Sequence, residues 1–148
     1  MDAAEYERIT VDYTEAAARA LTEVNPEMTF AYISGAGTDS TESGRFRWAR
    51  AKGRAENLVI AAFPNGYGLR PGFVRPVHGK KPRNTAFRVF TTVVAPISPV
   101  LQRLLPGLVI STAQIGQAAL GLARHGFPRR VLENRDMLEI ASAAREED

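Results

Sequence analysis

One stretch of the chain, an apolar run followed by a polar loop and an amphipathic segment, constrains the fold most. Thr29 to Ile33 is apolar and is bounded by a proline and a glycine, which predicts a buried strand with both faces covered. Ser34 to Gly44 predicts a polar loop. From Phe46 to Ala62, apolar residues recur at helical spacing, which predicts a helix with Trp48 and Lys52 on one stripe.

The remaining segments predict further alternation of helices and strands. The expected elements are a helix over Ala3–Val24, a strand from Tyr67 ending near Arg70, an exposed basic loop over Arg75–Arg88, two short helical pieces over Phe87–Leu105, a helix over Thr112–Arg124 opened by a capping box at Ser111, a short strand over Val131–Glu133 and a helix over Met137–Ala144 capped by Asp136. Such alternation favours an α/β fold with a parallel sheet.

Composition allows one globular domain and excludes several classes of site. The chain has 148 residues, of which 45% are hydrophobic, so a substantial core can form. It contains no cysteine, and His78 and His125 are too far apart for metal-ligand spacing, so we expect no metal site. The uncharged stretch 104–123 contains a proline, glycines and polar residues, so we expect no membrane span. The acidic first residues do not match a secretory signal, so we expect a cytoplasmic protein.

Positive charge is concentrated in the middle of the chain. Residues 43–88 contain eleven lysines and arginines and a single acidic residue, Glu56. Such a block can face a phosphate-bearing ligand, a nucleic acid or solvent, and solvent is the commonest case. Helical spacing places Trp48 away from Arg47 and Arg50, so we expect no nucleic-acid binding.

A glycine pair after the first strand partly matches a dinucleotide-binding turn. Gly35 and Gly37 follow the strand, and a third small residue falls at Ser40. A phosphate cradle also needs a helix that begins at once, because the amides of its first turn face the pyrophosphate. A polar loop intervenes here, so a plain strand-to-loop turn is favoured.

The spacing Trp48-x-x-x-Lys52, after a strand that ends in Ser34, resembles a known family. Together with the later run Leu-Arg-Pro-Gly at 69–72, it resembles the extended short-chain dehydrogenase/reductases of the NAD-dependent epimerase/dehydratase group. The similarity covers about residues 5–140. It implies an incomplete Rossmann-like parallel sheet flanked by helices, in a single domain 1–148 with a sheet-and-helix part (1–74), a substrate-side part (75–130) and a closing strand and helix (131–148).

The resemblance also implies a set of site residues. In the family a tyrosine transfers a proton, a lysine four residues later lowers the pKa of that tyrosine and binds the nicotinamide ribose, and a serine orients the substrate oxygen. Carried over, Lys52 and Ser34 are catalytic and Trp48 holds the tyrosine position. The implied cofactor-binding residues are Ser34, Gly35, Lys52, Pro71, Gly72 and Phe73. An indole N–H cannot transfer a proton near neutral pH, so catalysis by this chain is in question.

No strand-Gly-x-x-Gly-x-x-Gly-helix unit occurs in the sequence, which departs from the family pattern. We therefore expect the amino-terminal dinucleotide-binding half to be absent, and the open sheet edge to favour a homo-oligomer or a partner that supplies that half. The expected function is that of an NAD- or NADP-dependent epimerase/dehydratase-like fragment, acting on a small-molecule substrate and weak or inactive alone. The alternative is a non-catalytic ligand- or protein-binding module on the same fold.

Overall fold

The computed structural model describes residues 2–75 and 107–146. Along the chain the elements are α1 (Ala3–Glu7), the π-helical turn η1 (Arg8–Asp12), α2 (Tyr13–Val24), β1 (Thr29–Ile33), α3 (Arg47–Ala62), β2 (Asn65–Arg70), β3 (Phe73–Arg75), β4 (Val109–Ser111), α6 (Thr112–His125), β5 (Val131–Glu133) and α7 (Asn134–Glu146). The helical pieces expected over Phe87–Leu105, and all but the first residue of the basic loop expected over Arg75–Arg88, lie outside the described residues.

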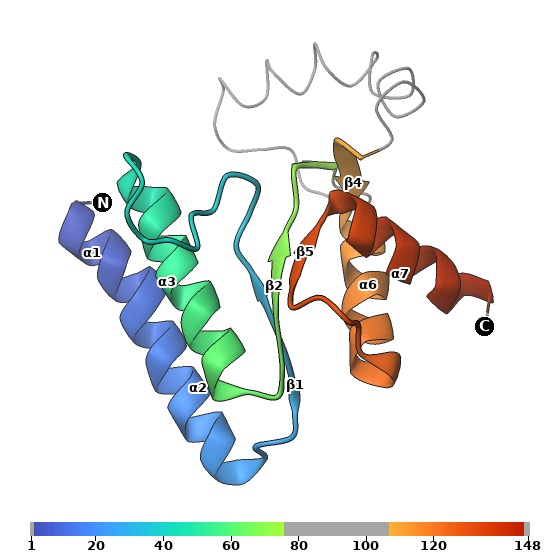
Figure 1. Cartoon of the computed structure of the whole chain (residues 1–148), viewed down its shortest axis with the longest axis horizontal. Helices are drawn as coiled ribbons and strands as arrows, with labels where there is room; N and C mark the ends of the chain where they lie inside the picture. The colour runs from blue at the N-terminus through green and yellow to red at the C-terminus, as the bar shows by residue number, and fades with distance from the viewer. Residues whose placement is uncertain (1, 76–106, 147–148) are drawn as a thin grey trace.

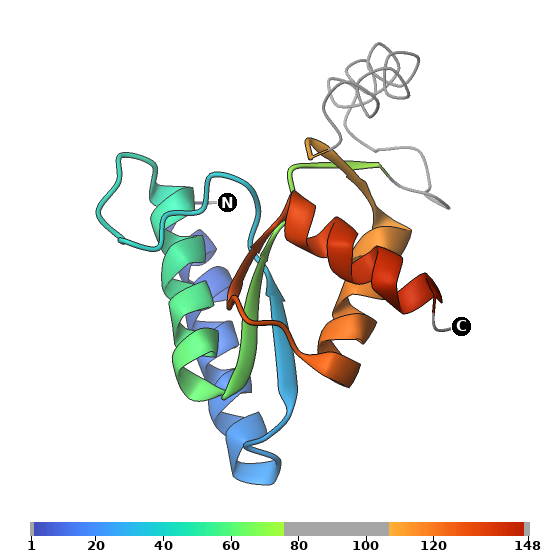
Figure 2. The same cartoon turned by 45° about the vertical axis from the view of Figure 1, so that its right-hand side comes forward.

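A parallel three-stranded sheet forms the centre, in the order β1-β2-β5. Ala31 pairs with Tyr67, and Leu69 pairs with Leu132. Helices α1, α2 and α3 cover one face and α6 and α7 cover the other (Figures 1 and 2). A second, two-stranded parallel sheet joins β3 to β4 beyond the carboxyl end of β2. The expected α/β class with a parallel sheet between helices is confirmed.

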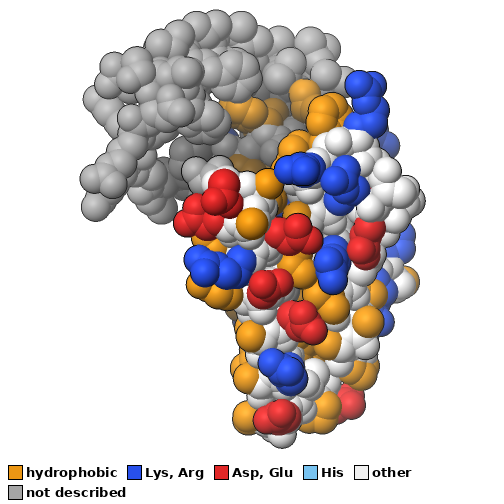
Figure 3. Space-filling view, turned by 90° about the vertical axis from the view of Figure 1, so that its left-hand side faces the viewer, with side chains coloured by type: hydrophobic (Ala, Val, Ile, Leu, Met, Phe, Trp, Pro, Cys, Tyr) orange, Lys and Arg blue, Asp and Glu red, His pale blue; other side chains and the backbone are white. Residues whose placement is uncertain are grey.

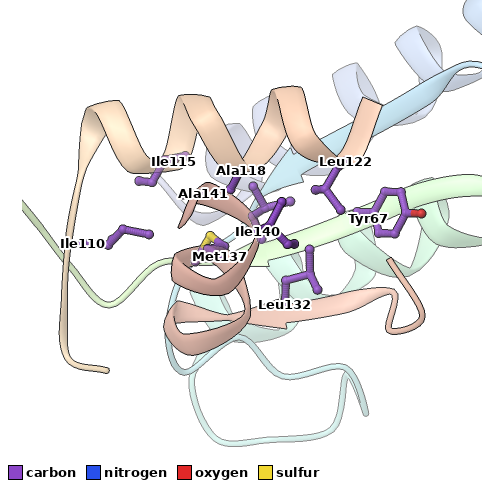
Figure 4. Close-up of a cluster of buried hydrophobic side chains, with 10 residues drawn as sticks. Tyr67, Ile110, Ile115, Ala118, Leu122, Leu132, Met137, Ile140 and Ala141 are labelled. Carbon is purple, nitrogen blue, oxygen red and sulfur yellow. The ribbon is translucent and has the colours of Figure 1, made fainter. Parts of the chain in front are cut away.

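Each face of the sheet has its own hydrophobic core. On the α6–α7 face, buried residues from both helices and from β2 and β5 pack together (Figure 4). On the opposite face, the Phe63 ring stacks on Phe30 with 5.2 Å between centroids, next to Ala18 and Val59. Fully burying an aliphatic or aromatic side chain stabilises a fold by about 1.5–3 kcal/mol, so these clusters hold the helices on the sheet.

Several expected boundaries are confirmed. The first helical segment ends at Val24, before Asn25-Pro26, and β2 ends at Arg70, before Pro71. Ser111 forms the expected capping box with Gln114. The π-helical turn η1 inside the first helical segment was not predicted, because no residue type in that stretch marks it.

Other expectations were wrong. Strand β1 packs on both faces, with Ala31 on one core and Phe30 and Tyr32 on the other, but it lies at the edge of the sheet and is only partly buried, and Ile33 is 53% exposed. On α3, Ala51, Ala55 and Val59 of the predicted apolar stripe are buried, but Trp48 is 41% exposed, and Glu56, which was not part of the stripe, is fully buried. Helix α7 begins at Asn134, and Asp136 accepts a hydrogen bond from the Glu133 amide within the first turn rather than preceding the helix as its cap.

Helix α3 contacts the loop after β1 through a glycine. A Cβ built on Gly53 would lie 1.8 Å from the backbone oxygen of Asp39, so only glycine fits where the helix meets the loop. None of the described helices is long and apolar enough to cross a membrane.

Replacing Gly53 with alanine should therefore lower stability, against the usual preference of helices for alanine. We expect Gly53→Ala to lower the free energy of unfolding by about 2 kcal/mol or more, because the loop backbone must move. The matched control is Gly116→Ala in α6, where a new Cβ meets nothing within 4 Å. That change should stabilise the chain by about 0.5–1 kcal/mol. Urea titrations of the unmodified chain and of the two variants measure both changes in the free energy of unfolding. Equal changes for the two variants would contradict the close contact between Gly53 and the loop.

Candidate functional site

A buried glutamate side chain lies next to the serine that follows β1, at the end of the sheet where the parallel strands finish. Ser34 is 6% exposed and follows β1 directly, and Glu56 on α3 is fully buried. The Ser34 hydroxyl lies 2.7 Å from Glu56 Oε2 and 3.1 Å from the Leu69 carbonyl oxygen. The hydroxyl predicted to orient a substrate is thus held inside the protein by Glu56.

Arg70, the last residue of β2, compensates the charge of Glu56. Its Nε donates to Glu56 Oε2 at 3.1 Å, and its Nη2 pairs with Oε1. The same guanidinium contacts the Ser40 hydroxyl, and its Nη1 lies 3.9 Å from Glu133 Oε1. Hydrogen bonding to Glu56 raises the pKa of Arg70. Removing one partner of a buried ion pair typically costs about 3–5 kcal/mol, so this pair fixes α3 against the sheet.

Local sequence makes room for this ion pair. Gly68 lies on β2 beneath Glu56, and a Cβ built on Gly68 would lie 2.4 Å from the Glu56 side chain. Glu56 follows Lys52 by four residues, so the two side chains leave adjacent turns of α3 on the same side. Two sequence features could have predicted this ion pair. Glu56 is the single acidic residue in a basic stretch, and Arg70 stands at the end of a predicted strand.

Lys52 contacts an aromatic ring rather than Ser34. Its Nζ lies 5.9 Å from the centroid of the Tyr32 ring, and burial lowers the pKa of Lys52. Burial also raises the pKa of Tyr32 to about 12, with Tyr6 and Glu56 adding smaller effects. Within the described ranges, Lys52 forms no ion pair. The structure therefore gives Lys52 a half-buried, aromatic setting on the α1–α3 face of the sheet.

Trp48 lies one turn before Lys52 and contacts the loop after β1. A Cβ built on Gly37, whose φ is +83°, would lie 3.2 Å from the end of the indole ring. The ring also lines a cavity of about 770 Å³ between α1 and α3, together with Tyr6 and charged side chains of both signs. Positive and negative side chains are interspersed on the face that carries these helices (Figure 3).

The loop after β1 and the segment after β2 lie side by side. The Ala36 amide donates to the Pro71 carbonyl oxygen at 2.9 Å, and the Gly72 amide donates to Asn134 Oδ1 at 2.9 Å. Gly35, with φ +130°, makes the turn that allows this approach. Residues 34–36 therefore run beside residues 69–71 at the carboxyl end of the parallel strands, whereas the Lys52 ammonium group lies against Tyr32.

Asn134 is a site residue that the sequence did not reveal. It is the first residue of α7, its side chain is 5% exposed, and its Nδ2 has no hydrogen-bond partner among the described residues. A buried unsatisfied donor costs about 1–3 kcal/mol, which marks the position as unusual. An asparagine after a short strand gives no signal of this kind, because its contact with Gly72 joins segments 62 residues apart.

Neither the family models nor the curated proteins include a match to this chain. In the part of the chain that the structure describes, no three histidine, aspartate or glutamate side chains are grouped so that they could hold a metal ion.

The shifted pKa of Tyr32 predicts a change at high pH. The folded protein favours neutral Tyr32, because its pKa is about 12 there against the ordinary 10.0. The stability that neutral Tyr32 contributes is therefore complete below pH 10 and is lost as the pH rises towards 12. Tyrosinate absorbance is titrated in the unmodified chain and in Tyr32→Phe, and the difference between the two curves belongs to Tyr32. That difference should have its midpoint near pH 12. Circular dichroism checks that the protein is still folded at each pH. Tyr13→Phe, at an exposed position, should leave that component in place. A midpoint near 10 for the removed component would contradict the buried setting.

Proposed function

We propose that this chain is an epimerase/dehydratase-like, nicotinamide-binding fragment that is weak or inactive on its own. The observation that carries the proposal is the parallel β1–α3–β2 unit, with Ser34 and Gly35 after β1 beside Pro71 and Gly72 after β2. Ligands of open parallel sheets bind outside the carboxyl ends of the strands, and the segments that contain these four residues lie there. The positions inferred from the family resemblance are thus partly grouped in space.

The residues divide between two roles in this proposal. Backbone at 35–37 and 71–73 borders the nicotinamide, and Trp48, beside Gly37, covers the ring by stacking. NAD or NADP, when bound, supplies hydride transfer to or from a small hydroxyl- or carbonyl-bearing substrate. Lys52, with its lowered pKa, lies one turn from Trp48 and reaches the ribose only if its side chain leaves Tyr32.

Two features support weak or absent catalysis. Trp48 stands where the family has its proton-transferring tyrosine, and an indole has no usable acid dissociation near neutral pH. The Ser34 hydroxyl is held by Glu56 at 2.7 Å, so it is not free to orient a substrate oxygen. The same two features favour the second candidate, a non-catalytic module that binds a ligand or a protein through this fold.

The free edge of β1 supports the involvement of a further polypeptide. Among the described residues, β1 pairs only with β2, and Ile33 at its end is 53% exposed. An unpaired edge strand is a template for pairing with another strand. We propose that a second copy or a partner chain adds strands here and completes the cofactor site.

Cofactor titration separates the two candidates, because Trp48 is the only tryptophan. Under the leading proposal, NADH or NADPH at up to about millimolar concentration quenches Trp48 fluorescence. Lys52→Met should weaken that response by about ten-fold, since a charge-assisted hydrogen bond to the ribose is lost. The control, Arg19→Met, removes a positive charge from an exposed position of α2 and should leave the response unchanged.

Turnover is tested in parallel by absorbance of the reduced nicotinamide over a panel of hydroxy and carbonyl compounds. We expect no measurable rate for the unmodified chain and a gain in Trp48→Tyr. No fluorescence response to either cofactor would favour the non-catalytic binding module, and robust turnover by the unmodified chain would contradict the claim of weak activity.

A further inference from the structure

The open edge of β1 carries main-chain groups that β2 does not bind. The Ser34 amide donates to the Leu69 carbonyl oxygen at 2.8 Å, in line with the register of the two parallel strands. Main-chain groups of successive strand residues point to opposite sides, so every second residue before Ser34 also faces β2. The residues whose amides and carbonyl groups face the open edge are Thr29, Ala31 and Ile33.

This edge lacks the features that usually protect an open strand. Thr29–Ile33 contains no charged residue and no proline, and its five residues pair with β2 in continuous register, without a bulge. Proteins generally place charges, prolines or bulges on edges that stay open, because unpaired backbone is a template for another strand. The strand β1 therefore has the character of one that is paired in the assembled protein.

The helices that pack on β1 also leave apolar side chains exposed. Phe30 packs with the core on the α2–α3 face, and Ala31 packs with the core on the α6–α7 face. Val24 at the end of α2 is 83% exposed, and Leu120 on α6 is 59% exposed. A sheet that continues through β1 brings further helices next to α2 and α6, so apolar surface on both faces is then available for packing.

The sequence of β1 complements itself when two copies run antiparallel. With the Ala31 residues of the two copies opposite each other, Thr29 lies opposite Ile33, and Phe30 lies opposite Tyr32. The edge-facing positions 29, 31 and 33 then meet only one another, so every unpaired amide and carbonyl group of one β1 finds its partner on the other. Residues directly opposite share a face, so aromatic side chains meet aromatic ones, β-branched side chains meet β-branched ones, and no like charges meet.

We propose that the partner at β1 is a second copy of this chain, with the two β1 strands antiparallel about Ala31. Each copy contributes its three-stranded sheet to one continuous sheet, with α2 beside α2 on one face and α6 beside α6 on the other. The inference rests on the part of the proposed function that gives β1 a partner, and it commits that partner to a second copy. A different polypeptide could bind the same backbone groups, but the match of the strand to itself favours the second copy.

Charges introduced at the two ends of β1 test both the dimer and its register. Thr29→Lys combined with Ile33→Lys places like charges opposite each other, and we expect the dissociation constant of the dimer to rise at least about ten-fold. Thr29→Glu combined with Ile33→Lys places opposite charges there, and association should return to within about three-fold of the unmodified chain. Sedimentation equilibrium over a range of concentrations measures the dissociation constants, and circular dichroism checks the fold.

Amide hydrogen exchange in the unmodified chain locates the interface without a substitution. The amides of Ala31 and Ile33 should exchange at least about ten-fold more slowly at a concentration that forms the dimer than after dilution. The Tyr32 amide, which faces β2, is the control and should be protected at both concentrations.

Three results would overturn the proposal. They are a monomer at all concentrations, equal association of the two double variants, and a dimer in which the Ala31 and Ile33 amides exchange as fast as after dilution. No nicotinamide is present in these measurements. A dimer of this kind that does not bind NADH would therefore count against the proposed function and leave this inference intact.

Discussion

The buried ion pair between Glu56 and Arg70 is the interaction on which this structure depends most. A carboxylate with no exposed surface loses its hydration, at a cost of several kcal/mol unless hydrogen bonds and an opposite charge replace the water. Arg70 replaces it with two contacts, and Ser34 adds a third. Because these residues come from α3, β2 and the end of β1, the pair joins three elements at the edge of the sheet where a ligand is expected.

The same interaction shapes what the site can do. It holds the Ser34 hydroxyl inside the protein, and it sets the rotation of α3 so that Lys52, one turn earlier, lies against Tyr32. The family resemblance implies that Ser34 and Lys52 act on one cofactor. In the geometry described here they serve different neighbours, which is why we propose binding with weak or absent turnover rather than an ordinary dehydrogenase. The backbone around Gly35 and Gly72 lies at the carboxyl end of the parallel strands, which is where open parallel sheets generally bind their ligands.

Much of the fold could be predicted from local sequence signals, because each depends on nearby residues. The proline after Asn25, the proline after Arg70 and the capping box at Ser111 set boundaries that the structure confirms. Burial was less predictable. Helical spacing assigned Trp48 to a buried stripe, yet Trp48 is partly exposed and Glu56 is buried. The burial of Glu56 depends on Arg70, which is 14 residues away on another element, so local spacing could not predict it.

The site could be predicted only in part, for the same reason. Asn134 has a buried amide group without a partner among the described residues, and its side chain is held by Gly72, 62 residues away, a contact that no local pattern predicts.

The central claim, that Glu56 and Arg70 hold the site together, is tested most directly by a double-mutant cycle of Glu56→Gln and Arg70→Gln. The account predicts a coupling free energy on the order of 2–3 kcal/mol, with the double variant more stable than the sum of the single effects implies. Additive effects, with coupling near zero, would contradict it.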